Sequence, residues 1–216
     1  MKNKIIKDAL ALTLITLVAG VALGGVYEIT KDPIAKQEAQ AKAEAYEQVF
    51  TDAAAFEEVE MDDTLIQTIR DQLDQEGYKA QSIEEVMRAE DQSGETLGYA
   101  FTVVTSEGYG GDIQFSMGVQ NDGTLNGISI LSIGETAGLG MNADTPAFKD
   151  QFVGKQVEKL QYTKNGATQD DEINAISGAT VTTNAMTNGV NAGLCAFRVM
   201  EGGDRDESKF TSGTFV

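Results

Sequence analysis

The run from Ile176 to Thr183 gathers hydroxyl side chains on a loop that carries little other side-chain bulk. Gly178 and Ala179 leave Thr180 accessible to an outside enzyme that would modify it. A helix is predicted directly afterwards, from Asn184 to Met200, so the hydroxyls lie at or just before a helix N-terminus. Free backbone N–H groups and the positive end of the helix dipole favour a phosphate there. The pattern therefore suggests Thr180 as a phosphoester attachment point.

The same residues have a simpler interpretation. Clusters of Ser, Thr and Asn are common before helices because their side chains accept hydrogen bonds from the first backbone N–H groups. Gly178 and Ala179 are also ordinary loop residues. From spacing alone, capping and phosphate attachment both remain open.

Two further stretches are rich in glycine, and each follows a predicted strand. They run from Glu107 to Ile113 and from Gly134 to Met141. Glycine lets backbone amides approach a planar ligand closely, and Tyr109 or Leu139 could stack on such a ring. The alternative is a pair of ordinary surface turns.

Composition excludes several kinds of chemistry. The chain has 216 residues, 34 acidic against 16 basic ones, and a formal charge of −18, which argues against nucleic acid as a partner. It has no His, so imidazole-ligated haem, most zinc sites and His-based triads are excluded. The single Cys195 cannot hold an iron–sulfur cluster and is expected to be a small core residue. Redox chemistry would need an organic cofactor.

The amino terminus predicts a membrane anchor. Lys2, Lys4 and Lys7 precede a nearly uncharged run from Ala9 to Tyr27, which is about the length that spans a hydrocarbon core. A cleaved signal peptide is the alternative, but no clean cleavage site follows. The positive-inside rule places the N-terminus in the cytoplasm and the C-terminal domain outside it. We therefore expect a single-pass protein of the cell membrane that contacts the bilayer.

The remaining pattern predicts an α+β domain with an antiparallel or mixed sheet flanked by helices. Two helices come first, a short helix from Pro146 to Phe152 lies later, and the long helix comes last. Three hairpin turns are predicted at Asp91–Gly94, Asn121–Gly123 and Asn165–Gly166. The predicted helices and strands around them cover residues 33–50, 63–76, 83–88, 96–105, 113–119, 125–133 and 157–163, with a segment near Ile173.

The three motifs together resemble the FMN-binding domain family. Ser177-Gly178-Ala179-Thr180, followed by Thr182, is similar to its S/T-G-A-T signature, whose last Thr carries FMN through a phosphoester bond. The glycine stretches resemble the G-Y-x-G-x-I and E-T-P-G-L-G motifs of its flavin pocket. The resemblance implies covalent FMN on Thr180, no catalytic residue and no metal. The other cofactor-binding residues that it implies are Ser177, Gly178, Ala179, Thr182, Tyr109, Gly110, Glu135, Thr136, Gly138, Leu139 and Gly140.

Two positions depart from the family pattern. Ala137 replaces the Pro of the second glycine motif, which loosens the turn. Asn174 stands where an acidic residue usually precedes the S/T-G-A-T signature by three positions. Asp170, Asp171 and Glu172 are close enough to substitute for that charge.

Within the family, the chain looks most like the G component of the Rnf complex (RnfG), an ion-translocating ferredoxin:NAD⁺ oxidoreductase. The resemblance implies an electron-transfer flavoprotein of the membrane, without independent turnover, whose partners are the A, B, C, D and E components of Rnf. It also implies that a flavin transferase attaches the FMN from FAD. The alternatives are the C component of the Na⁺-translocating NADH:quinone reductase, and a non-redox, membrane-tethered binding module.

The expected division of the chain has four parts. A cytoplasmic stub and transmembrane anchor cover residues 1–30, and a helical lead-in covers 31–80. The FMN-binding domain covers 81–201, and a polar tail covers 202–216.

Overall fold

The computed structural model describes residues 2–202, with side chains from residue 4 onward, so the predicted tail lies almost wholly outside it. The chain divides into two compact units, residues 1–43 and 44–216. The functional division predicted at residues 30, 80 and 201 stays a prediction.

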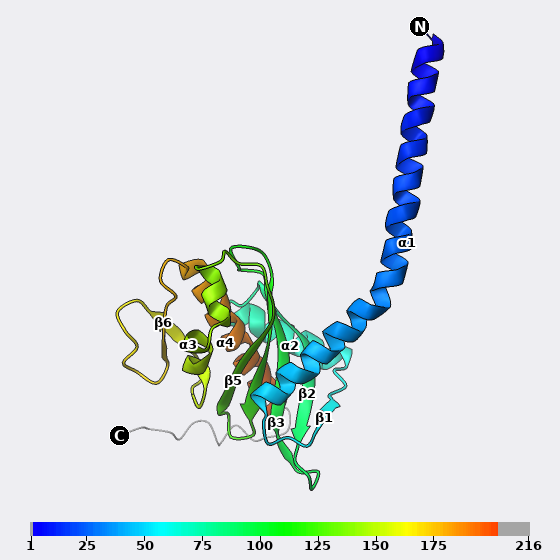
Figure 1. The fold of residues 1–216 in the computed structure, drawn as a ribbon. Helices are drawn as coiled ribbons and strands as arrows, with labels where there is room; N and C mark the ends of the chain where they lie inside the picture. The colour runs from blue at the N-terminus through cyan, green and yellow to red at the C-terminus, as the bar shows by residue number, and fades with distance from the viewer. Residues whose placement is uncertain (1, 203–216) are drawn as a thin grey trace, which may run out of the picture. The chain divides into compact units, whose positions relative to one another are not determined.

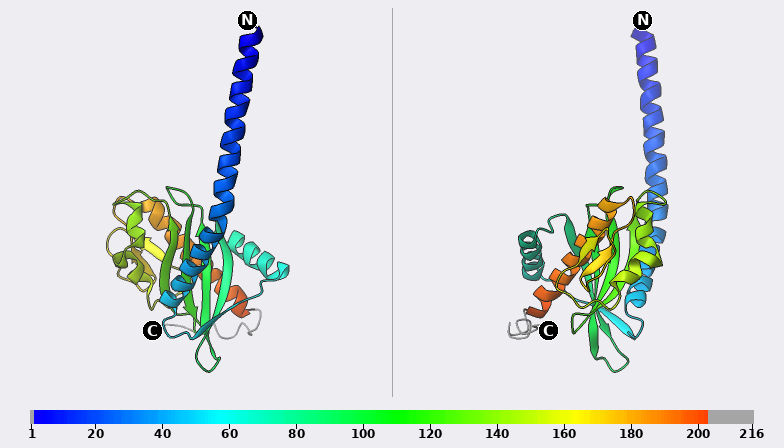
Figure 2. Two further views of the ribbon diagram at one scale, coloured as in Figure 1. Left: turned by 45° about the vertical axis from the view of Figure 1, so that its right-hand side comes forward. Right: turned by 90° about the vertical axis from the view of Figure 1, so that its left-hand side faces the viewer.

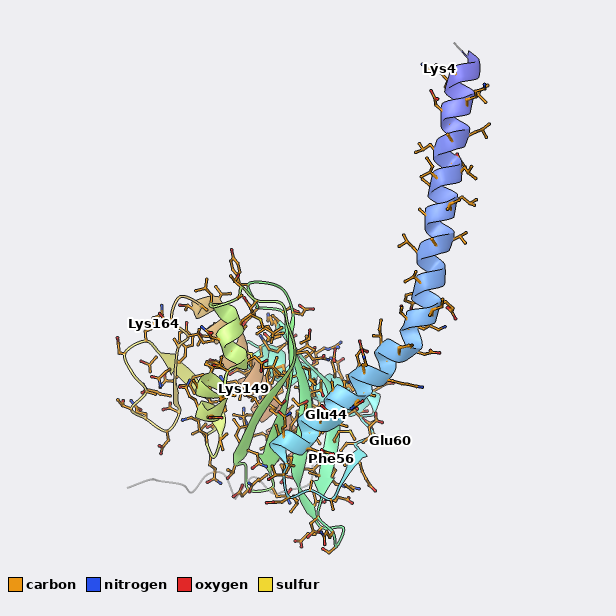
Figure 3. The ribbon with its side chains drawn as sticks, viewed as in Figure 1. Lys4, Glu44, Phe56, Glu60, Lys149 and Lys164 are labelled. Carbon is orange, nitrogen blue, oxygen red and sulfur yellow. The ribbon has the colours of Figure 1, made fainter. Side chains whose placement is uncertain are left out.

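The first unit is part of one helix, α1 (Lys2–Val49). The predicted anchor at residues 9–27 and the helix predicted at 33–50 form one continuous helix that runs through Pro33. Its side chains before Glu44 project on all sides, and the apolar ones from Ile5 to Ile29 are largely exposed (Figure 3). Among the described residues, α1 is the one helix that is long and apolar enough to cross a membrane.

The second unit is built on a five-stranded antiparallel sheet in the order β1-β2-β3-β4-β5 (Figure 1). Turns at Gly94 and Gly123, both with positive φ, connect β2 to β3 and β4 to β5, which confirms those two predicted hairpins. The first strand was missed because its four residues, Ala-Phe-Glu-Glu, show little alternation. The strands are β1 (Ala55–Glu58), β2 (Gln81–Glu90), β3 (Thr96–Thr105), β4 (Ile113–Gln120) and β5 (Leu125–Ile133).

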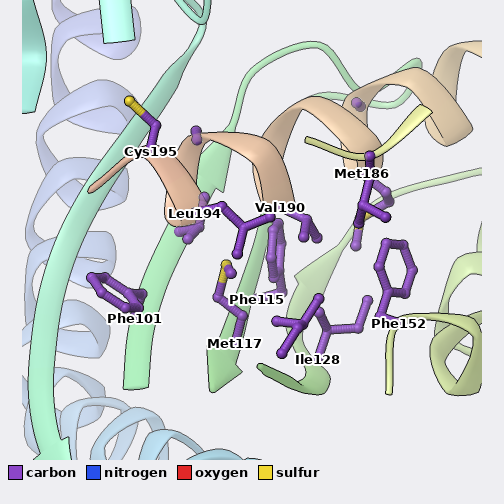
Figure 4. Close-up of a cluster of buried hydrophobic side chains, with 14 of the residues drawn as sticks. Phe101, Phe115, Met117, Ile128, Phe152, Met186, Val190, Leu194 and Cys195 are labelled. Atoms are coloured by element: carbon purple, nitrogen blue, oxygen red, sulfur yellow. The ribbon is translucent and has the colours of Figure 1, made fainter. Parts of the chain in front are cut away.

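One face of the sheet carries the main core, beneath α2 (Asp63–Glu76) and α4 (Thr180–Gly202) (Figure 2). Asp62 caps the start of α2, and Gly77 ends it with φ +90°, as the sequence predicts for a C-terminal glycine. In Figure 4, Val190 and Leu194 of α4 point towards Phe115 and Met117 of β4. Gly189 and Gly193 make this close packing possible, because a Cβ at either position would overlap those two side chains.

The opposite face is covered by the end of α1 and by Phe50. Tyr46, Val49 and Phe50 pack against Ala89 and Ala100 in a second, smaller apolar cluster. The Tyr46 hydroxyl also lies 2.7 Å from that of Thr102 on β3. Burial raises the pKa of this phenol more than the hydrogen bond to Thr102 lowers it.

The prediction of a hairpin at Asn165–Gly166 is wrong. The short strands β6 (Gln161–Thr163) and β7 (Glu172–Asn174) pair in parallel. The intervening loop folds back on itself, because Glu172 accepts backbone hydrogen bonds from residues 168 and 169, and Asn174 accepts one from Ala167. The loop therefore brings the chain back to the start of β6 instead of reversing it at a two-residue turn.

A short helical segment links β5 to β6. It consists of η1 (Gly140–Asp144), α3 (Pro146–Lys149) and η2 (Asp150–Phe152). The helix predicted from Pro146 to Phe152 is thus present, with its last turn in 3-10 form. The rings of Phe148 and Phe152 pack edge to face with their centroids 5.4 Å apart, and both residues belong to the main core.

Candidate functional site

Helix α4 begins at Thr180, four residues before the predicted start at Asn184. Thr and Val are weak helix formers, so little in their residue types indicates this first turn. Thr183 stabilises it: its backbone N–H donates to Ala179 O at 3.0 Å, and its hydroxyl donates to the same oxygen at 2.9 Å. Thr180 therefore lies inside the helix, directly after the cap position.

The cap geometry separates the two interpretations of the hydroxyl cluster. The residue before the helix is Ala179, which has no side-chain oxygen. Thr183 does accept a hydrogen bond from Ile176 N at 3.0 Å, so one hydroxyl of the cluster serves the helix start. Thr180 is partly exposed and Ser177 is exposed. Capping thus accounts for Thr183 and leaves Thr180 available.

The two glycine-rich stretches lie side by side at one edge of the sheet. They follow Thr105 and Ile133, which both pair with Ile113 of β4. A Cβ at Gly110 would overlap the carbonyl oxygen of Gly134. The backbone N–H of Tyr109 donates to Glu135 Oε1 at 2.7 Å, and Glu135 is buried. Glycine and a buried carboxylate therefore join the two loops.

The second glycine stretch also meets the start of α4. A Cβ at Gly140 would lie 2.5 Å from Glu135 Oε2 and 2.6 Å from Thr182 Oγ1. One at Gly178, whose φ is +76°, would lie 3.1 Å from Leu139 Cδ2. All three sequence motifs thus converge around the first turn of α4.

Three large apolar side chains are exposed at this point. Tyr109, Leu139 and Val181 are 76%, 44% and 50% exposed, although each belongs to a loop or helix end fixed by the contacts above. Thr136 and Gly138 are exposed beside them. The Thr136 carbonyl accepts from the N–H groups of Leu139 and Met141 at 3.1 and 3.2 Å, which holds the turn.

One group of residues beside the site was not predicted. The Glu107 carboxylate accepts hydrogen bonds through Oε2 from Asn184 Nδ2 at 3.2 Å and from Asn188 Nδ2 at 2.7 Å. The available sequence signal was the spacing of Thr180, Asn184 and Asn188, which are four residues apart and so share one face of a helix. We call the three hydrogen-bonded residues, Glu107, Asn184 and Asn188, the Glu107 clamp.

Asn174 precedes the loop at residues 177–180 and is held by amide contacts. Its backbone N–H and its Nδ2 both donate to Gln151 Oε1, at 2.7 and 3.0 Å. Its Oδ1 accepts from Ala167 N at 2.7 Å. The side chain at this position therefore fixes the strand that leads into Ser177.

The far end of α4 has a different character. Cys195 is buried and its Sγ lies 3.4 Å from Glu76 Oε1. Burial, with the nearby Glu76 charge, raises the pKa of this thiol to about 12. This confirms the expectation that Cys195 is a core residue.

Two family descriptions match the chain. The FMN-binding domain matches residues 108–194, a range that contains almost all of the three motifs. The RnfG N-terminal region matches residues 1–49.

Similar proteins extend the match to almost the whole chain. The G component of a Na⁺-translocating ferredoxin:NAD⁺ oxidoreductase complex from Acetobacterium woodii is 32% identical over 196 residues, covering 90% of this chain and 92% of that protein. The G component of a proton-translocating complex from Clostridium ljungdahlii is 28% identical, covering 94% and 96%. The C component of a Na⁺-translocating NADH-quinone reductase from Pasteurella multocida is 41% identical over 80 residues, covering 33% and 31%.

Proposed function

The chain belongs to the RnfG family, the G components of ion-translocating ferredoxin:NAD⁺ oxidoreductase complexes, and on that basis we propose that it is a membrane-anchored electron-transfer protein with FMN bound covalently to Thr180. The observation that carries the proposal is the position of Thr180. It is partly exposed in the first turn of a long helix, where both glycine stretches converge.

The start of α4 fits a phosphate. The N–H groups of Thr180, Val181 and Thr182 precede the first intrahelical hydrogen bond, and they lie at the positive end of the helix. Gly178 keeps a Cβ away from Leu139, and Ala179 adds only a methyl group beside the Thr180 hydroxyl. Ser177 is exposed next to this position and is suited to donate a further hydrogen bond. Thr182 is buried against Gly140 and is suited to hold the turn in place.

The loops around Thr180 fit the flavin ring. Tyr109 and Leu139 offer exposed apolar faces, and Gly110, Gly138 and Gly140 keep the surrounding backbone free of side chains. Glu135 fixes the Tyr109 backbone, and the Thr136 carbonyl fixes the turn that carries Leu139. When bound, FMN supplies one- and two-electron redox chemistry, and the protein supplies position and polarity.

Attachment requires a flavin transferase and FAD as co-substrate. The Thr180 hydroxyl oxygen forms a bond to the phosphorus on the FMN side of FAD, and the pyrophosphate P–O bond breaks. AMP leaves, and the hydroxyl proton passes to solvent through a base of the transferase. The partial exposure of Thr180 supports access by a second protein.

The proposed setting is a membrane complex. The relatives named above are parts of such complexes, and α1 is long and apolar enough to anchor the chain beside the other components. Lys4 and Lys7 before the apolar run favour a cytoplasmic N-terminus and an external FMN-binding domain. Alkaline phosphatase fused after residue 202 would be active only if that domain lies outside.

Similarity over the whole length favours the Rnf complex over the NADH-quinone reductase. The match to the Pasteurella multocida protein covers about a third of each chain, whereas the matches to the G components cover nine-tenths or more. A non-redox tethering module would have no use for an attached flavin, so it is separated by the experiment that follows.

The test is co-expression of the full chain with a competent flavin transferase. Flavin fluorescence should stay with the wild-type chain after denaturing electrophoresis, be lost in Thr180→Ala and be retained in Thr180→Ser. Thr168→Ala, on an exposed loop before β7, is the matched control and should keep the signal. An unlabelled wild-type chain, or a labelled Thr180→Ala chain, contradicts the proposal.

A further inference from the structure

The Glu107 clamp lies on the same face of α4 as the attachment residue. Thr180, Asn184 and Asn188 are partly exposed, and Val181 beside them is half-exposed. Asn184 and Asn188 stand about 6 and 12 Å along the helix axis from Thr180. The residues of this segment that face inward are Thr182, Thr183, Ala185, Met186, Thr187 and Gly189.

The clamp presents hydrogen-bond acceptors along this strip. Within residues 4–202, both described donors to the carboxylate use Glu107 Oε2, so Oε1 remains for a ligand hydroxyl. Each asparagine donates its Nδ2, which leaves its Oδ1 as an acceptor. A row of acceptors that includes the Glu107 carboxylate suits a polyol and disfavours a phosphate.

The order of groups along α4 therefore matches the order of groups in FMN. Backbone donors at Thr180–Thr182 come first and suit the phosphate. The acceptors of the clamp come next and suit the three ribityl hydroxyls. Tyr109, two residues after Glu107, is 76% exposed and suits the isoalloxazine ring.

Tyr109 is well placed for that role because its backbone is held at its own N–H and at Glu107, two residues earlier. Glu135 accepts from its N–H, and the clamp ties the preceding residues to α4. A ring that projects from a fixed backbone loses little conformational entropy when it stacks on a ligand.

We propose that Glu107 is a positioning residue for FMN, which directs the ribityl chain along the Asn184–Asn188 face of α4 and places the ring against Tyr109. The inference rests on the proposed attachment at Thr180. The negative charge of Glu107 also opposes the gain of electrons by a flavin held beside it, so it lowers the reduction potential.

The test uses the full chain, flavinylated by the transferase, and compares Glu107→Gln with wild type. Glutamine keeps one oxygen that can accept from both asparagines, so the tie to α4 survives while the charge and one acceptor are lost. Attachment at Thr180, measured by the mass of the intact chain, should be unchanged. Time-resolved anisotropy should show that the ratio of docked to undocked flavin falls about fivefold, as for the loss of one hydrogen bond. The reduction potential should shift upward.

The controls separate this outcome from general effects. Glu95→Gln, in the exposed β2–β3 turn, removes the same charge elsewhere and should leave docking and potential unchanged. Asn188→Ala removes the shorter clamp bond and should lower docking even if Glu107→Gln does not fold. Equal docking and potential in Glu107→Gln, Asn188→Ala and Glu95→Gln would overturn the role of Glu107. Loss of attachment in a folded Glu107→Gln chain would overturn it as well, since Glu107 would then act before the cofactor is in place. If the proposed attachment at Thr180 is itself wrong, the wild-type chain will carry no flavin, and this result is distinct from the outcomes above.

Discussion

Helix α4 has two halves that meet the rest of the domain in different ways. The first half, residues 180–188, carries hydroxyls and amides and meets loops through glycine contacts and single hydrogen bonds. The second half, residues 189–200, packs apolar side chains on the sheet. Its Asn191 accepts a hydrogen bond from Leu160 N and donates one to Leu160 O. The difference indicates that the second half mainly stabilises the fold, whereas the first half, which also buries Met186, offers the site. Substitutions in the two halves should therefore change different properties.

The largest expected effect is on stability, from the second half. Leu194 is 4% exposed, and Leu194→Ala should lower the free energy of unfolding by about 2–5 kcal/mol, because it leaves a cavity against the sheet. Denaturant unfolding of the full chain in detergent measures the loss. Flavin attachment under native conditions should remain. A Leu194→Ala variant with wild-type stability but no attached flavin would contradict the different roles of the two halves.

The next effect is on the site, from the loop that meets the first half. Gly140→Ala forces a methyl group against Glu135 and Thr182, which should cost about 1–3 kcal/mol and slow flavin attachment. Gly134→Ala is the matched control, since its Cβ would be in ordinary contact at 3.5 Å from Gly110 O. Equal attachment rates in the two variants would show that close approach at Gly140 is not needed.

A smaller, pH-dependent effect should come from Glu76, which binds Arg198 of the second half at 3.0 Å. Burial raises the pKa of Glu76, but hydrogen bonds from Gln72 and the charge of Arg198 outweigh it and hold the pKa below its ordinary value of 4.5. The carboxylate therefore contributes stability above that value, which is lost as pH falls through the lower, folded pKa.

Glu76→Gln should accordingly lower stability by about 1 kcal/mol at pH 6 to 7 and by less as pH falls below 4.5. Denaturant unfolding of wild type and variant across this range measures the difference. If the difference in unfolding free energy between wild type and variant stays the same below pH 4.5, the effect comes from packing of the side chain and not from its charge.

The smallest expected effect is on the chemical reactivity of the Cys195 thiol. Because burial raises its pKa to about 12, the thiol should not react with iodoacetamide near neutral pH until the chain unfolds. Mass spectrometry before and after denaturant measures the labelling. Rapid labelling of the native chain would show that the second half of α4 opens to solvent.

Local signals were sufficient to predict much of the fold. The turn residues at Gly94 and Gly123, and the capped helix from Asp63 to Glu76, made four strands and α2 visible in the sequence. The parallel pairing of β6 and β7 was missed because it depends on side chains of Glu172 and Asn174 that bond their own loop. The Asn165-Gly166 dipeptide on which the hairpin was predicted does not indicate such contacts.

The site was predicted only as far as its motifs reached. The convergence of the three motifs depends on which strand ends are neighbours, and the resemblance to a known family supplied that in advance. Two residues of the Glu107 clamp, Asn184 and Asn188, lie outside any motif. Both donate hydrogen bonds to Glu107, which is 77 and 81 positions earlier in the sequence. Tertiary pairs of this kind leave only the four-residue spacing on α4 as a trace in the sequence.

The glycines at 189 and 193 set more than the packing of α4. Because a Cβ at either position would overlap Phe115 or Met117, the two glycines also affect the angle at which α4 crosses the sheet. Thr180 lies about 20 Å from Gly193 along the helix axis. Each degree of rotation about Gly193 would displace Thr180 by roughly 0.35 Å. Residues deep in the core, far from the proposed cofactor, thereby govern where its attachment atom stands and how far it lies from an electron donor or acceptor in a neighbouring protein.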